Sequence, residues 1–226
     1  MMFSKPIAMP RGTHYGNNYW EVYSYKLKRI VCLFSNLEYE NFLTLEMDPL
    51  VETYCEQPLE VELHLDDKSV KTIFDFWVKY KNGSEQLQEV KYSKELYGDD
   101  KAALRTQEQI RRQKLWCKEN NIDYVIRTEK TIHSGEFTIR NFNIMAANVR
   151  RYTILQNNYN EKQLVEHLKN TKSTIKELFE SNILPVNQEI QFLCFMYYKG
   201  IITLNINDRP IDYSTEVSLW LKKNII

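Results

Sequence analysis

The strict alternation of apolar and polar side chains from Leu59 to Leu65 (Leu-Glu-Val-Glu-Leu-His-Leu) is the feature that most constrains the fold. Successive side chains of a strand point to opposite faces, so this pattern predicts a half-buried strand. Residues 70–80, which are rich in β-branched and aromatic side chains, predict a second strand. Asn82-Gly83 is typical of a tight turn, and residues 87–92 predict a third strand. We therefore expect an antiparallel three-stranded meander.

Helical patterns flank these strands. Ser35-Asn36-Leu37-Glu38 is a capping box, in which the Ser35 hydroxyl and the Glu38 carboxylate each accept a backbone N–H, and Asp48-Pro49 ends the helix that it opens. Residues 101–120 predict a second helix, and residues 122–127 a short fourth strand. The order of elements predicts an α/β core with a mixed sheet flanked by helices.

The pattern changes after about residue 150. Three short helical segments cover residues 161–170, 174–182 and 187–199. Gly200 suits the position that follows a helix, and a strand is expected from Ile201. Helices followed by a β-ribbon predict a small winged-helix-like domain. We expect one domain over residues 1–150 and a second over residues 151–226.

Composition excludes several classes of protein. The chain has 226 residues, with 43% hydrophobic side chains, which is enough for a folded core. Its 4 cysteines are spread singly, so neither a zinc site nor a disulfide framework is indicated. No glycine-rich nucleotide motif, secretory signal or apolar run long enough for a membrane span is visible, which favours a cytoplasmic protein.

A formal net charge of zero conceals an asymmetry. Residues 51–100 hold 6 Lys/Arg and 12 Asp/Glu, a net charge of −6, whereas residues 101–150 hold 10 and 5, a net charge of +5. Carboxylates that hold cations and basic side chains that hold phosphates would give this distribution. Two ordinary solvated faces of a small domain would give it as well.

Three carboxylates and one lysine form the candidate chemical site. Glu89 and Lys91 are two residues apart in the third expected strand and so share a face, and the preceding turn can bring Asp75 of the second strand close to them. Glu38 can add a third carboxylate from the first helix. Such oxygen ligands suit Mg²⁺ or Mn²⁺, and Lys91 would orient or deprotonate a water or stabilise developing charge. A solvent-exposed edge strand would also explain Glu89 and Lys91, and the capping box alone explains Glu38.

Several blocks of sequence keep their order over residues 23–132. They are Tyr23-Ser24-x-Lys26 with Arg29, Ser35-Asn36-Leu37-Glu38, Phe42-Leu43-x-Leu45-Glu46-x-Asp48-Pro49-x-Val51, Glu56-Gln57-Pro58-Leu59, Asp75-Phe76-x-Val78, Gly83, Glu89-Val90-Lys91 and Ile122-x-x-x-Ile126-x-Thr128-Glu129-Lys130-x-Ile132. Together they resemble the TnsA family, the endonuclease subunits of heteromeric TnsA–TnsB cut-and-paste transposases.

The resemblance implies a restriction-endonuclease-like catalytic domain of the PD-(D/E)xK type. It implies Mg²⁺-dependent cleavage of DNA at the 5′ ends of a transposon, with Mn²⁺ as a substitute. Glu38, Asp75, Glu89 and the backbone carbonyl of Val90 match the metal ligands, and Lys91 matches the catalytic lysine. Glu89 stands where the family also allows glutamine.

The resemblance also implies partners. A TnsB-like transposase would cut the 3′ ends of the transposon, and the C-terminal domain would contact a TnsC-like AAA+ ATPase regulator. The protein would be bacterial and nucleoid-associated when bound to transposon-end DNA.

Five basic residues crowd the expected second helix and are candidates for contacts with DNA phosphates. They are Lys101, Arg105, Arg111, Arg112 and Lys114. A solvated helix face would explain them equally well. Zero net charge argues against tight independent binding to DNA, which favours a subunit placed on DNA by its partners.

Two other functions stay open at this point. One is a stand-alone restriction or repair endonuclease of the same fold. The other is an adaptor that bridges transposase and regulator without cutting DNA.

Overall fold

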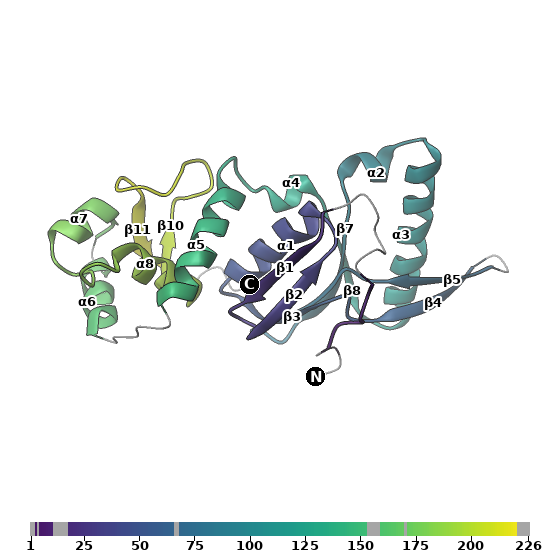
Figure 1. Ribbon diagram of the computed structural model, residues 1–226, viewed down its shortest axis with the longest axis horizontal. Coiled ribbons are helices and arrows are strands. Elements are labelled where there is room, and N and C mark those ends of the chain that lie inside the picture. Colours follow the sequence, from purple (N-terminus) through teal and green to yellow (C-terminus); the bar gives the residue numbers. More distant parts are fainter. Residues whose placement is uncertain are drawn as a thin grey trace. The chain divides into compact units, whose positions relative to one another are not determined.

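The computed structural model describes residues 3, 5–10, 18–65, 68–152, 159–169 and 171–220 (Figure 1). The chain divides into two compact units. The first consists of Met1–Leu45 and Leu50–Ile132, and the second of Glu46–Pro49 and His133–Ile226. None of the helices in these described segments is both long and apolar enough to cross a membrane.

The first unit is built around a mixed four-stranded sheet with the strand order β3-β6-β7-β8. These strands are β3 (Val51–Glu56), β6 (Phe76–Tyr80), β7 (Glu85–Val90) and β8 (Asp123–Arg127). β3, β6 and β7 are antiparallel, whereas β8 runs parallel to β7. Gly83 lies in the turn between β6 and β7 with φ +89°, a conformation that glycine adopts without strain. The expected α/β core with a mixed sheet is confirmed.

Helices and two hairpins complete the first unit. They are β1 (Trp20–Ser24) with β2 (Arg29–Leu33), α1 (Asn36–Met47), β4 (Glu60–Leu65) with β5 (Lys68–Ile73), α2 (Ser93–Tyr97), α3 (Lys101–Glu119) and α4 (Glu129–Ile132). The parallel pairing of β7 and β8 needs a crossover, and α2 and α3 supply it. Figure 1 shows α3 beside β8 and alongside the β4–β5 ribbon, both of which it contacts.

The expected meander of strands is wrong in detail. The alternating segment, β4, pairs only with β5 in a separate two-stranded ribbon, so it is not part of the central sheet. The segment expected as one strand over residues 70–80 divides at Phe74 and Asp75 into β5 and β6. In the sheet, β6 pairs with β3. The sequence did not predict β3, because consecutive residues from Tyr54 to Glu56 are all buried and do not alternate.

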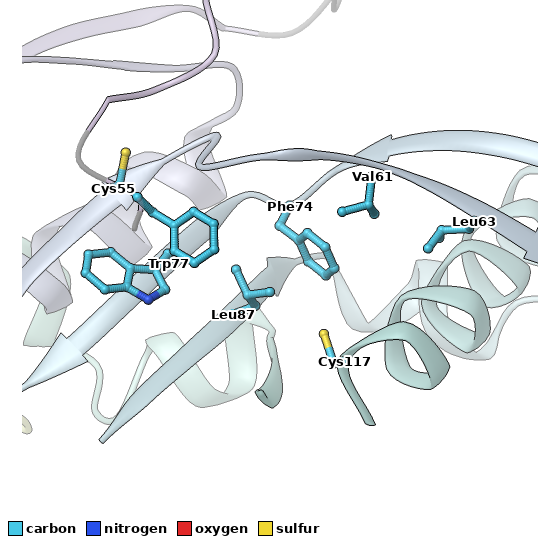
Figure 2. Packing of buried hydrophobic residues seen from close by; sticks show 8 residues of the cluster. Cys55, Val61, Leu63, Phe74, Trp77, Leu87 and Cys117 are labelled. Atoms are coloured by element: carbon cyan, nitrogen blue, oxygen red, sulfur yellow. The ribbon is translucent and has the colours of Figure 1, made fainter. Parts of the chain in front are cut away.

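A buried apolar cluster holds this division of the strand in place. Phe74 is fully buried, and Figure 2 shows its ring between Val61 and Leu63 of β4 on one side and Trp77 and Leu87 of the sheet on the other. The aromatic side chain therefore anchors the chain where it passes from the ribbon to the sheet. Full burial of such a side chain contributes about 1.5–3 kcal/mol.

The second unit contains four helices and a small antiparallel sheet in its described residues. Its elements are α5 (Thr138–Tyr152), α6 (Tyr159–Leu168), β9 (Ser173–Thr174), α7 (Ile175–Glu180), α8 (Glu189–Tyr198), β10 (Ile202–Leu204) and β11 (Glu216–Leu219). β11 lies between β10 and β9. The three helices predicted after residue 150 correspond to α6, α7 and α8, although Asn170, the expected end of the first, lies outside the described residues. Gly200 follows α8 with φ +71°, as expected.

The expected domain boundary near residue 150 falls inside α5. This helix packs against α8, so the compact units divide between Ile132 and His133. Buried Asn141 of α5 fixes the loop after β10 by donating to the carbonyls of Ile206 (2.6 Å) and Arg209 (2.7 Å). The sequence did not predict this division between the units, because the segment before residue 150 showed no boundary signal. The winged-helix-like character of this unit stays a prediction.

The Phe74→Ala substitution tests the anchor between ribbon and sheet. It should lower the free energy of unfolding of the first unit by about 3–5 kcal/mol, because it removes a large buried ring and leaves a cavity. Urea denaturation followed by circular dichroism measures the change. Tyr97→Ala, at a side chain that is 82% exposed, should change the same quantity by less than about 0.5 kcal/mol. Equal effects of the two substitutions would contradict the anchoring role.

Candidate active site

Asp75 lies at the bend between β5 and β6. Phe76 pairs with Gln88 in the antiparallel register, so Asp75, one residue earlier, faces the end of β7. Its Oδ2 atom accepts a hydrogen bond of 2.6 Å from the backbone N–H of Val90. The Nζ atom of Lys91 lies 3.7 Å from the same oxygen. The end of β7 thus holds the Asp75 carboxylate from both backbone and side chain.

Glu89 and Lys91 share one face at the end of β7. The Nζ atom of Lys91 lies 2.7 Å from the Oε1 atom of Glu89, which is completely buried. Lys91 therefore makes ion pairs with both Asp75 and Glu89. The two carboxylates lie on the same side of the sheet, with the ammonium group within reach of each.

Two glutamines of α3 hold the Glu89 carboxylate from the other side. The Nε2 atoms of Gln109 and Gln113 donate to its Oε1 (2.8 Å) and Oε2 (2.9 Å), respectively. Both amides also lie within hydrogen-bond distance of the Thr72 hydroxyl. Tyr124 donates to the Oε1 atom of Gln113 at 2.8 Å. Sequence reasoning missed this network; the four-residue spacing of the glutamines, which places both on one helix face, is the signal that could have indicated it.

Glu38 takes its place from the capping box at the start of α1. The Ser35 hydroxyl accepts the Glu38 backbone N–H at 3.1 Å, and the Glu38 carboxylate accepts from the Ser35 hydroxyl and from the Phe34 backbone N–H, each at 3.0 Å. Gln57 approaches the same carboxylate at 3.4 Å. The contact between Ser35 and Glu38 predicted from the sequence is present, although the backbone N–H that the carboxylate accepts is that of Phe34. It does not exclude a second role, because Glu38 also lines the cleft that contains Asp75.

The buried charges of the site influence one another. Burial, and after it the negative charge of Asp75, raises the pKa of Glu89 to about 7, and the same two causes raise the pKa of Glu38 to about 7. Burial acts to lower the pKa of Lys91, but the Asp75 and Glu89 carboxylates outweigh it and hold this pKa above its usual range. Lys91 is therefore an ammonium group. Three carboxyl groups thus surround one ammonium group, and a further cation would favour their ionised forms.

These residues line one cleft of about 790 Å³ in the first unit. Its walls come from α1, the β4–β5 ribbon, the ends of the sheet strands and one face of α3. The charged residues that line it are Glu38, Glu60, Lys71, Asp75, Glu89, Lys91, Lys101, Arg105, Glu108 and Arg112. The acidic residues and the basic residues are equal in number, so the cleft itself is close to neutral before any cation binds.

The five basic residues proposed from the sequence divide into two groups. Lys101, Arg105 and Arg112 line the cleft, whereas Arg111 and Lys114 do not. Helical spacing explains the division. Lys101, Arg105 and Arg112 follow one another at intervals of four and seven residues and so share a face of α3, whereas Arg111 and Lys114 lie on other faces.

The site matches a hard divalent cation in the chemistry of its donors. Carboxylate oxygens are the ligands that Mg²⁺ and Mn²⁺ prefer, and Asp75, Glu89 and Glu38 supply them around Lys91. In the described part of the chain, however, no three His, Cys, Asp or Glu side chains converge tightly enough to form a ready-made metal site. Lys91 pairs with Asp75 and Glu89 in the arrangement described here.

A family model matches the part of the chain that contains most of these residues. Residues 48–129 match the family model described as TnsA-like endonuclease N terminal. This segment is similar to the N-terminal domain of TnsA-like endonucleases. It contains Asp75, Glu89 and Lys91 together with α3, whereas Glu38 precedes it in the chain. No curated protein matches the chain. The resemblance to TnsA-like endonucleases predicted from the sequence is confirmed, and the matched residues include Asp75, Glu89 and Lys91 but not Glu38.

The Tyr124→Phe substitution tests the hydrogen-bond chain that supports Glu89. It should lower the free energy of unfolding by about 1–2 kcal/mol, because it leaves the Oε1 atom of buried Gln113 without its donor. Thermal unfolding of the two proteins measures the effect. Tyr97→Phe removes a hydroxyl from an exposed tyrosine and serves as the matched control. Equal stability of Tyr124→Phe and the wild type would show that this hydroxyl does not support the site.

Proposed function

We propose that this chain is a Mg²⁺-dependent endonuclease subunit of a cut-and-paste transposase, which hydrolyses DNA at the 5′ ends of the mobile element. The observation that carries the proposal is the position of Lys91, which pairs with both Asp75 and Glu89 inside the TnsA-like endonuclease domain. The donor set, the buried negative charge and the cleft around them support a site for hydrolysis of a phosphodiester.

Asp75, Glu89 and Glu38, with the backbone carbonyl of Val90, would hold the Mg²⁺ ion, and Mn²⁺ would substitute. When bound, the ion supplies an activated water and neutralises charge on the phosphate. The protein supplies the positions of the ligands. Gln109 and Gln113 fix the Glu89 carboxylate, which is the support that outer hydrogen bonds give to metal ligands.

Lys91 would stabilise the negative charge that develops on the attacked phosphate. Its pKa is held above the usual range by two carboxylates, so it is a poor base and a persistent cation. An ammonium group fixed beside the reacting phosphate lowers the energy of the charged transition state. This favours charge stabilisation over deprotonation of the water, the other role considered for this residue. The products would be a 3′-hydroxyl and a 5′-phosphate.

The proposed partners follow from the same assignment. A TnsB-like transposase would cut the 3′ ends of the element, and the second compact unit would contact a TnsC-like AAA+ ATPase. The formal net charge of zero supports a subunit that relies on partners for its position on DNA, since phosphate contacts dominate independent DNA binding.

The Asp75→Asn substitution tests the proposed chemistry. It should lower the rate of strand cleavage at least about 1000-fold, because the amide cannot supply the negative charge that holds the cation. The assay is cleavage of transposon-end DNA by the full chain with its partner transposase and Mg²⁺. A calorimetric titration should show Mg²⁺ binding to the wild type and greatly weakened binding to the variant.

Asp123→Asn, at an exposed aspartate of β8, is the matched control and should cut at the wild-type rate. Normal cleavage by Asp75→Asn would refute the proposed site. Absence of Mg²⁺ binding to the wild type would favour a non-cutting adaptor. Efficient cutting by the purified chain without any partner would favour a stand-alone endonuclease.

A further inference from the structure

One face of α3 presents basic side chains to the cleft beyond those that the proposed chemistry uses. Lys101, Arg105 and Arg112 line the cleft together with Gln109, which lies on the same face and contacts Glu89. Gln109 thus marks the point where this face of α3 meets Glu89, and the basic side chains lie before and after it along the helix. At 1.5 Å per residue, Lys101 and Arg112 are about 16 Å apart along the axis.

Arg112 is unusual among these side chains because it is nine-tenths buried, with 9% of its surface exposed. Its Nε atom donates to the Oε1 atom of Glu108 at 2.7 Å, which fixes the plane of the guanidinium. Its Nη1 atom is buried and has no hydrogen-bond partner within the described segments. Arg112 lines the cleft, and a buried guanidinium N–H without an acceptor costs about 1–3 kcal/mol or more, so an acceptor bound in the cleft would stabilise this side chain.

Gln109 and Arg112 are separated by three residues, less than one helical turn, and both line the cleft. A group that reached the Arg112 guanidinium from the cleft would therefore lie near Glu89. An anion is the natural partner, because a guanidinium carries only donors and binds phosphate oxygens in a fixed fork.

We propose that Arg112, with Arg105 and Lys101 beside it, forms a subsite for an uncleaved backbone phosphate of the DNA strand whose neighbouring phosphate lies at Asp75 and Lys91. The proposal rests on the proposed endonuclease function and adds to it a residue that sets the register of the strand. Arg112 is the fixed contact, because Glu108 holds its guanidinium group. Exposed Arg105 and Lys101 would bind further phosphates of the same strand.

The geometry favours a polynucleotide over a small anion. The axial span of about 16 Å is several times the size of one phosphate group, so the three cations together would contact more than one phosphate of a strand. A single phosphate would need only one of the three cations. Glu108 and Glu60 also line the cleft and hold its formal charge near zero. The fixed position of Arg112 therefore contributes more to phosphate binding than the net charge of the cleft does.

The test measures binding of the full chain to a fluorescein-labelled DNA duplex of arbitrary sequence, because phosphate contacts do not depend on base sequence. Anisotropy is recorded over a range of KCl concentrations with Ca²⁺, which accepts the same oxygen ligands. Arg112→Gln should weaken binding about tenfold and reduce the steepness of the salt dependence by about one unit. Arg112→Lys should lie between Arg112→Gln and the wild type, since the charge remains but the fork is lost.

Lys118→Gln removes an exposed charge of α3 that does not line the cleft, and it should change affinity by less than about twofold. Arg105→Gln, at an exposed position, should weaken binding severalfold and so tests the basic face of α3 even if Arg112→Gln is unstable. Unchanged affinity in both cleft variants would overturn the subsite and leave an ordered water as the partner of Arg112. Equal loss in Lys118→Gln and Arg112→Gln would overturn it as well.

The phosphate subsite and the proposed endonuclease function can fail independently of each other in these experiments. If the wild type binds Mg²⁺ and cuts DNA but Arg112→Gln binds and cuts normally, the subsite is wrong and the endonuclease assignment stands. If the wild type never cuts, while Arg112→Gln still shows the tenfold loss of binding, the phosphate subsite is supported and the proposed chemistry is wrong.

Discussion

The burial of Glu89 determines the arrangement of the first unit around its cleft. A carboxylate without solvent exposure is tolerated only when donors surround it. Lys91 provides a cation from the same strand, and Gln109 and Gln113 provide amides from α3. Since both glutamines also reach Thr72 of β5, one buried acid ties together the sheet, the ribbon and the crossover helix. The Glu89 carboxylate, which the proposed chemistry needs, therefore also holds the elements of the first unit together.

The sequence predicted the fold class and the main polar residues of the site, because both depend on local patterns. The two-residue spacing of a strand placed Glu89 and Lys91 on one face. The capping box accounted for Glu38 as a structural residue, and the resemblance to the TnsA family added it to the site. The pairing of strands was not predictable in the same way: β3 lacks alternation, and the alternating strand β4 lies in a separate ribbon. The supporting glutamines were also missed, since their role depends on how α3 packs against the sheet, which local periodicity does not reveal.

The balance of charge in the cleft connects structure with the proposed reaction. Asp75, Glu89 and Glu38 crowd around a single ammonium group, and burial raises the pKa of two of these carboxyl groups to about 7. A divalent cation would relieve this crowding and allow the acids to ionise together, as ligands must. The same cleft is also lined by basic side chains of α3. Carboxylates for a cation and basic groups for phosphate thus lie in one space, which is the combination that phosphodiester hydrolysis requires.

The most direct test of this account is the position of a bound cation. Crystals of the full chain grown with Mn²⁺ should show anomalous scattering from an ion that contacts both the Asp75 and the Glu89 carboxylates. A cleft that holds no such ion at saturating Mn²⁺, or an ion bound without contact to Asp75, would contradict the account.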